Sequence, residues 1–105
     1  MYKVFRSEQY QKLFDTLDSS EQKRVEQCEE NIQMKPYSSK PLGYRFLREK
    51  KFHGKRLLLL IYEKEELVVL ATICTKKTQK KEIEIITSLF SWYKKQVEEI
   101  LKGSF

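Results

Sequence analysis

The sequence of 105 residues predicts one α+β domain with the element order β-α-α-β-β-β-α. Three observations carry this prediction. Two amphipathic helical segments lie near the N-terminus, apolar strand-like runs begin at Tyr44, and helical spacing of apolar residues returns after Thr78. We expect a small four-stranded sheet, antiparallel or mixed, backed by an N-terminal αα-hairpin and followed by a long C-terminal helix. Because a chain of this length buries a single core, residues 1–105 are expected to form one domain.

The N-terminal third predicts a strand followed by two helices. Residues 2–6 alternate as in a strand, and the serine after them suits the cap of a helix over residues 7–17. An aspartate followed three residues later by a glutamate resembles a capping box and opens a second helix over residues 18–35. The loop at residues 36–43 holds both prolines and ends this helical hairpin.

The middle of the chain predicts three strands. Residues 44–52 and 55–62 flank His53-Gly54, which suits a tight hairpin turn. A second turn at residues 63–66 leads into a strand over residues 67–74. Both later strands are nearly continuous apolar runs, which is typical of central strands covered on both faces.

The C-terminal segment, residues 78–102, is predicted to be one long helix that covers the second face of the sheet, with Gly103 as its C-terminal cap. Its apolar residues recur at helical spacing: Ile83, Ile86, Phe90, Tyr93, Val97 and Ile100.

Charge is distributed unevenly along a chain with a formal net charge of +6. Residues 35–56 hold eight basic residues and one acidic residue, and four further lysines lie at residues 76–81. Residues 7–34 hold three basic and seven acidic residues. If the two basic segments converge, they form a surface suited to a polyanion such as RNA. The alternative is an ordinary solvated surface.

Several function classes are excluded by the sequence. The longest apolar run, Leu57 to Tyr62, has six residues and is too short to span a bilayer, so we expect a cytoplasmic protein with no membrane partner. Cys28 and Cys74 lie within apolar patterns, which favours buried thiols. Motifs for nucleotide or metal binding are absent, and a single histidine forms no histidine cluster, so neither a metal nor a cofactor is expected.

Three short motifs and their order resemble the RelE/ParE superfamily of bacterial and archaeal toxins, over residues 2–81. They are Leu47-Arg48, then Gly54-Lys55-Arg56 before an apolar strand ending in Ile61-Tyr62, then an apolar strand running into Cys74-Thr75-Lys76-Lys77. The resemblance implies the toxin of a type II toxin-antitoxin system, neutralised by a cognate antitoxin. RelE-like members cleave mRNA, usually on the ribosome, and ParE-like members inhibit DNA gyrase. The RelE-like branch implies a metal-independent mRNA endoribonuclease.

Such a ribonuclease lets the ribose 2′-OH attack the adjacent phosphate, so it needs positive charge at the phosphate and proton carriers beside it. Arg56 matches the arginine that opens the third strand in the family, where a guanidinium suits bidentate contact with phosphate; the alternative is an arginine that only solvates the strand end. Arg48 occupies a second family position, which in relatives is either functional or structural. Lys77, or Lys76 with a shift of one residue, occupies a third, where a lysine replaces the commoner arginine.

Glu49 and His53 are the titratable proton carriers near this basic segment. Glu49 suits a base or an ion-pair partner, and His53 suits an acid or a base, or lies idle at the hairpin tip. The remaining basic residues of the two segments are expected to bind RNA: Arg45, Lys50, Lys51, Lys55, Lys80 and Lys81.

One departure from the family leaves alternatives open. Several relatives carry a tyrosine shortly after the last strand, whereas residues 78–83 hold no aromatic residue, and Tyr93 falls on the apolar helical stripe. The alternative is a nonenzymatic, degenerate or ParE-like member that binds gyrase, RNA or a protein without cleavage. A third hypothesis is a homodimer through the C-terminal helix, which requires Leu89 and Trp92 to be exposed outside the stripe.

Overall fold

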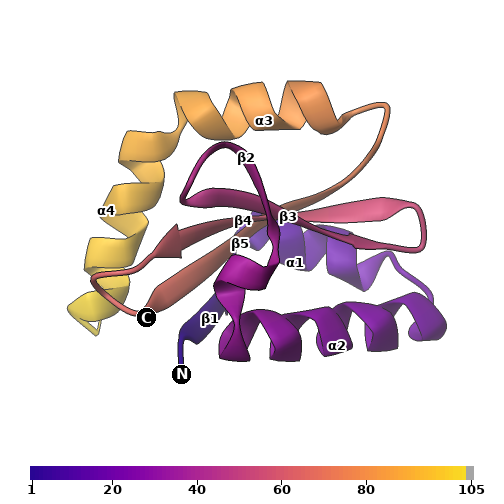
Figure 1. Cartoon of the computed structure of the whole chain (residues 1–105), viewed down its shortest axis with the longest axis horizontal. Coiled ribbons are helices and arrows are strands. Elements are labelled where there is room, and N and C mark those ends of the chain that lie inside the picture. Colours follow the sequence, from indigo (N-terminus) through magenta and orange to yellow (C-terminus); the bar gives the residue numbers. More distant parts are fainter. Residues whose placement is uncertain (104–105) are drawn as a thin grey trace.

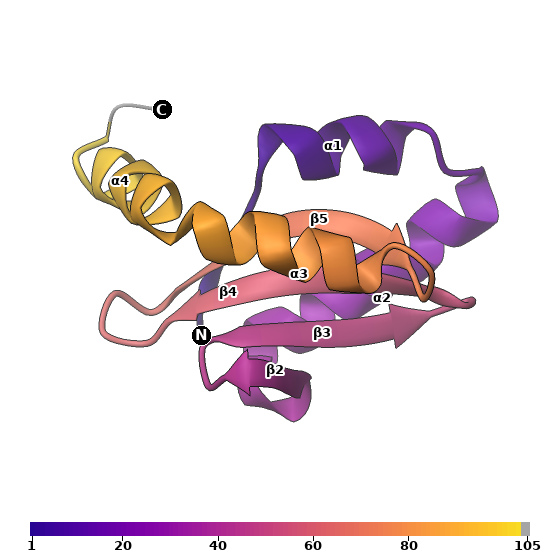
Figure 2. The same cartoon turned by 90° about the horizontal axis from the view of Figure 1, so that it is seen from above.

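The computed structural model describes residues 1–103 and shows helices on both faces of one five-stranded sheet (Figures 1 and 2). The strands are β1 (Lys3–Arg6), β2 (Lys40–Tyr44), β3 (Leu47–Phe52), β4 (Lys55–Tyr62) and β5 (Leu67–Thr75). The helices are α1 (Glu8–Asp15), α2 (Ser19–Met34), α3 (Gln79–Ser88) and α4 (Phe90–Leu101), with a 3₁₀ turn at Pro36–Ser38. No helix within residues 1–103 is long and apolar enough to cross a membrane.

The sheet is mixed, as expected, with the strand order β1-β5-β4-β3-β2. β1 pairs with β5 in parallel, and the other neighbours are antiparallel. Every residue of β5 from Leu67 to Cys74 is buried, and β4 is buried from Leu57 to Ile61. The prediction that the two apolar strands are central and covered on both faces is therefore confirmed.

The β3–β4 hairpin turns at His53-Gly54, as predicted. Both residues have positive φ, 41° and 75°, which is the backbone of the tight turn that matches the twist of paired strands. The turn sets Lys51 opposite Arg56 and Glu49 opposite Leu58. This register decides which charged side chains share a face of the sheet.

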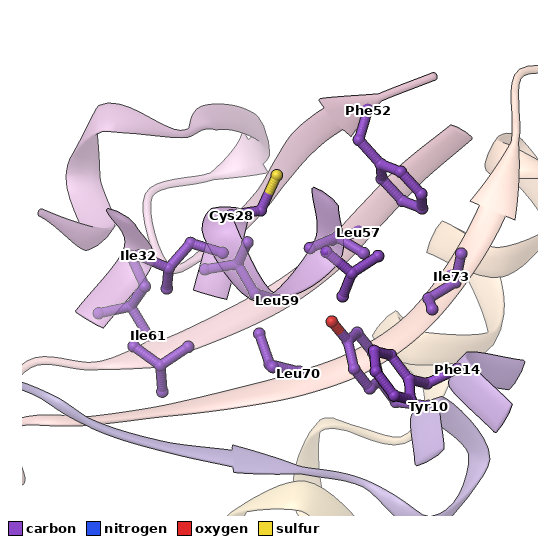
Figure 3. Packing of buried hydrophobic residues seen from close by; sticks show 12 residues of the cluster. Tyr10, Phe14, Cys28, Ile32, Phe52, Leu57, Leu59, Ile61, Leu70 and Ile73 are labelled. Carbon is purple, nitrogen blue, oxygen red and sulfur yellow. The ribbon is translucent and has the colours of Figure 1, made fainter. Parts of the chain in front are cut away.

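The αα-hairpin of α1 and α2 covers one face of the sheet. The Ser7 side chain accepts a hydrogen bond from the Tyr10 amide, and Asp18 accepts one from the Glu21 amide, so both predicted caps are confirmed. Figure 3 shows the resulting core, in which aromatic and aliphatic side chains of the hairpin meet those of the sheet. Its labelled residues are Tyr10, Phe14, Cys28, Ile32, Phe52, Leu57, Leu59, Ile61, Leu70 and Ile73.

α3 and α4 cover the opposite face, as the C-terminal stripe predicts. All six residues of the stripe pack in or against a second core with alternate side chains of the strands. Gly103 follows the last helical turn with a φ of 73°, and its amide donates to the carbonyl of Ile100, which is the geometry of a helix C-cap. Tyr93 is buried in this core, as its place in the stripe predicts.

The C-terminal segment differs from the prediction, because it forms two helices that meet at Leu89 instead of one long helix over residues 78–102. Near the break, the hydroxyls of Thr87 and Ser88 donate to the carbonyls of Ile83 and Ile85, which competes with regular helical bonding. Figure 1 shows α4 turning sharply away from the direction of α3. The bend keeps both halves of the stripe on the core.

A fifth strand, β2, occupies the second half of the predicted loop 36–43 and ends at Tyr44, so the strand predicted over residues 44–52 is shorter and β3 begins only at Leu47. β2 contains Pro41 and Gly43, both depleted in strands, and its register with β3 shifts between Pro41 and Tyr44. Proline is tolerated here because β2 is an edge strand, where one row of backbone amides needs no partner strand.

Candidate active site

Glu49 and Arg56 form the centre of the candidate site. Leu47 and Leu58 belong to the core under α3 and α4, so strand alternation places Glu49 and Arg56 on that same face. Arg56 Nε lies 3.5 Å from Glu49 Oε2, and the two side chains are 12% and 2% exposed. The register of the hairpin thus sets a buried carboxylate against a guanidinium.

Gln79, the first residue of α3, closes the site from above the sheet. Its side-chain amide donates a hydrogen bond to Glu49 Oε2. The carboxylate of Glu49 therefore has one partner from β4 and one from α3. Gln79 is not among the site residues predicted from the sequence, because its partner lies 30 residues away and a lone glutamine carries no signal for it.

Arg56 is held by charge more than by hydrogen bonds. Its Nε is buried, and no hydrogen-bond partner for it lies within residues 1–103. A buried polar atom without a partner is uncommon in folded proteins, and a catalytic role is one of its explanations. The Arg56 guanidinium thus retains hydrogen-bonding capacity that its neighbours do not use.

The thiol of Cys74 lies beside this pair, since Cys74 is opposite Arg56 in the sheet. Burial, and then the charge of Glu82, raises the pKa of Cys74 to about 11. A thiol with this pKa is protonated near neutral pH, so Cys74 is not an activated nucleophile.

Four exposed lysines follow β5 directly. Lys76 and Lys77 lie in the turn after the strand, and Lys80 and Lys81 lie in the first turn of α3. The turn is fixed at its ends by Thr75 and Thr78: the Thr75 amide donates to the Thr78 hydroxyl at 3.1 Å. Because Lys55 and Arg56 are paired with Thr75 and Cys74, this turn starts at the edge of the Arg56 site. Lys51, opposite Arg56, is exposed on the same face.

Arg48 lies on the other face, with the α1–α2 core, and all its contacts are structural. Its Nε and Nη2 donate to the carbonyl of Ser39 at 2.9 and 2.7 Å, Nη1 donates to that of Arg45, and Nη2 also donates to that of Tyr37. Arg48 is 9% exposed. It fastens the segment before β2 and the β2–β3 turn to the sheet.

Three of the predicted RNA-binding residues have partners away from the Arg56 site. Arg45, which lies in the turn that precedes β3, pairs with Glu63. Arg45 is six residues before Lys51, which corresponds to roughly 20 Å along a strand. Lys50 donates to Asn31 Oδ1, and Lys55 bridges to Glu21 at 2.8 Å, both toward α2. Lys51 lies opposite Arg56, the Lys76-Lys77 turn follows the strand end that pairs with Lys55 and Arg56, and Lys80 and Lys81 follow Gln79 in α3, whereas the side chains of these three residues have partners elsewhere.

His53 lies exposed at the tip of the β3–β4 hairpin, one position beyond the last strand pair. Its ring centroid is 6.4 Å from that of Phe52. Its role as a proton carrier stays a prediction. Among residues 1–103, no group of three His, Cys, Asp or Glu side chains has the arrangement of a metal site.

No protein-family model and no curated protein matches the sequence of this chain. Its structure, however, is similar to that of an arginine-to-alanine variant of the E. coli toxin RelE in the free state, with a TM-score of 0.71 and 14% identity over 84% of this chain and 97% of that one.

Two toxin-antitoxin complexes are also similar. The archaeal RelE–RelB complex of Pyrococcus horikoshii gives a TM-score of 0.62 and 14% identity, and covers 71% of this chain and 94% of the matched chain. The RelBE2 complex of Mycobacterium tuberculosis gives a TM-score of 0.62 and 19% identity, and covers 71% of this chain and 98% of the matched chain. At these identities the likeness is one of fold, and it confirms the resemblance drawn from the sequence at that level: the chain has the fold of the RelE toxins.

Proposed function

We propose that this chain is the toxin of a type II toxin-antitoxin pair and that it cleaves mRNA at the Arg56–Glu49 site. The observation that carries the proposal is the guanidinium of Arg56, set 3.5 Å from a buried carboxylate at the edge of an exposed lysine turn. Fixed positive charge beside a proton acceptor is what the attack of a ribose 2′-OH on the adjacent phosphate requires.

In the proposed reaction, the 2′ oxygen forms a bond to phosphorus while Glu49 accepts its proton. Arg56, with Lys77 or Lys76, stabilises the charge on the phosphate oxygens. The bond from phosphorus to the 5′ oxygen then breaks, leaving a cyclic 2′,3′-phosphate and a 5′ hydroxyl. His53 is the candidate donor of the proton to that leaving oxygen. The reaction uses neither a metal nor another cofactor.

The lysines that lie near Arg56 would hold the RNA backbone. Lys51, Lys76, Lys77, Lys80 and Lys81 are all exposed, and each adds a charge that attracts phosphate. Because Glu49 is 2% exposed and bonded to Gln79, access of RNA to the carboxylate requires the first turn of α3 to move. An mRNA target, reached on the ribosome, would place the activity in the cytoplasm.

A cognate antitoxin is the proposed partner. Solved complexes with this fold pair a RelE toxin with a RelB antitoxin in E. coli and in Pyrococcus horikoshii. By analogy, an antitoxin would hold this chain inactive by blocking the Arg56 site.

A second candidate function is binding without cleavage, of gyrase, RNA or a protein. It is favoured by the arrangement that neutralises Arg56 with Glu49, and by the lack of a tyrosine in residues 78–83. In this case the site would bind a phosphate but would lack a group placed to protonate the leaving oxygen.

Primer extension on a translated mRNA after controlled expression tests the proposal. Cuts are expected with the wild type and should vanish in Arg56→Ala, in Glu49→Gln and in Lys76→Ala/Lys77→Ala. The matched control is Lys94→Ala/Lys95→Ala, which removes two exposed lysines from α4 and should cut as the wild type does. Intact mRNA at full expression of wild-type protein would reject cleavage and favour the binding function, which a gyrase assay then examines.

A further inference from the structure

An apolar groove runs along the flank of α3 and α4 that faces β5 and the start of α1. Two adjoining hollows form it, of about 320 Å³ and about 170 Å³. They share Ser7, Glu8, Trp92 and Tyr93. Figure 2 shows α1 and α3 running on either side of β5. The lining of the two hollows includes none of Glu49, Arg56 and Gln79.

Large apolar side chains are exposed along this groove. Ile85, Leu89 and Trp92 are 42%, 38% and 48% exposed, and all three line the larger hollow. The hypothesis of a homodimer through the C-terminal helix required Leu89 and Trp92 to be exposed, and both are. A contiguous group of this kind marks a surface that binds another molecule.

A buried hydroxyl in the groove lacks a partner. Thr72 lines the larger hollow and is 3% exposed, and its Oγ1 has no hydrogen-bond partner within residues 1–103. Thr72 lies beside an irregularity of β5, where Leu58 pairs with Thr72 but Leu59 pairs with Leu70. Such bulges re-aim side chains. A buried hydroxyl without a partner thus lies at the floor of the groove.

The rim of the groove is acidic, although the whole chain is basic. Glu8 and Glu82 line the larger hollow. Glu8 also pairs with Lys12 at 3.4 Å, but the two side chains are 86% and 70% exposed, so this pair is weak and leaves the Glu8 carboxylate open to a partner. The one basic residue in the lining is Arg6, which is already held by both carboxylate oxygens of Glu29, at 3.0 and 2.8 Å. Two copies joined symmetrically at this groove would bring acid against acid. Charge complementarity instead favours a basic occupant.

We propose that this groove binds a basic amphipathic segment of a partner protein. The apolar side chains of the segment pack on Ile85, Leu89 and Trp92, and its lysines or arginines pair with Glu8 and Glu82. The inference does not depend on whether the Arg56 site cleaves RNA.

Trp92 is the only tryptophan of the chain, so its fluorescence reports directly on the groove. The probe is a short peptide of leucine and lysine with the leucines at helical spacing, and its matched control replaces every lysine with glutamate. The lysine peptide should shift the emission of the full chain to shorter wavelength with saturation. The glutamate peptide should not. No shift with the lysine peptide, or an equal shift with both, overturns the proposal.

Variants then locate the binding. Glu8→Lys/Glu82→Lys should weaken binding of the lysine peptide by about tenfold or more. Glu26→Lys/Glu30→Lys makes the same charge change on α2 and should leave the affinity unchanged. Equal weakening by both double variants overturns the proposal. Ile85→Glu, checked for folding by circular dichroism, should abolish the shift. Sedimentation equilibrium supplies a second test: a wild-type dimer that Ile85→Glu dissociates would show that a second copy occupies the groove.

Discussion

Gln79 and Glu49 join α3 to the middle of β3 by a hydrogen bond from the side-chain amide to the carboxylate. The amide lies at the first residue of the helix, and the carboxylate is buried beneath it. A single contact thus both orients the carboxylate toward Arg56 and fixes the start of α3 on the sheet.

Replacing Gln79 with alanine is expected to loosen α3. Because the buried carboxylate loses a donor, the free energy of unfolding should fall by about 2 kcal/mol. Amide hydrogen exchange within residues 79–88 should become faster. Gln27→Ala, which removes an exposed amide from α2, is the control and should change neither. Unchanged exchange in α3 with Gln79→Ala would contradict the role of this contact.

Removing one member of the Glu49–Arg56 pair is expected to cost more than removing both. Glu49→Ala leaves a buried guanidinium without its charge partner, so the free energy of unfolding should fall by about 3 kcal/mol. Glu49→Leu/Arg56→Met removes both charges and should cost less. Urea denaturation of the single and double variants measures the difference. Additive losses would mean that the two side chains are not coupled.

Arg48 is expected to matter for stability and not for phosphate binding. Arg48→Ala removes the donors that hold three backbone carbonyls, so the free energy of unfolding should fall by about 3 kcal/mol. Arg48→Lys should restore only part of the lost stability, because a single ammonium does not reproduce the several donors of the planar guanidinium. Arg24→Ala on the exposed surface of α2 is the control. A stable Arg48→Ala protein would contradict the structural role and return Arg48 to the candidate site.

The core could be predicted from the sequence because its patterns are periodic. Continuous apolar runs predicted the central strands, and the stripe from Ile83 to Ile100 predicted the cover on the second face. The tight turn at His53-Gly54 followed from the need for positive φ. These features depend on local sequence, which a single chain displays.

The edge of the sheet and the site depend on tertiary contacts and were harder to predict. Pro41 and Gly43 are residues that disfavour a strand, and β2 forms only because this segment pairs with β3. The helix break at Leu89 could not be predicted, because neither proline nor glycine lies near it. Gln79 meets Glu49 across 30 residues, and nothing in a lone glutamine predicts such a partner. The sequence left open whether Arg48 is functional or structural, and the strand register, which places it on the opposite face from Arg56, decides for the structural role.

Cys74 is expected to make stability depend on pH above about pH 9. Burial raises the pKa of its thiol from 9.0 to about 11 in the folded chain. Between these values the unfolded chain loses the thiol proton and the folded chain retains it. The stabilisation is therefore fully present below pH 9 and is lost as pH rises toward 11. In Cys74→Ala the decrease in unfolding free energy between pH 8 and pH 11, measured by urea denaturation, should be smaller than in the wild type. Loss of the thiol from the core lowers stability equally at both pH values, so the difference between the two measurements isolates its ionisation. An identical decrease in both proteins would show that Cys74 titrates alike in the folded and unfolded chains.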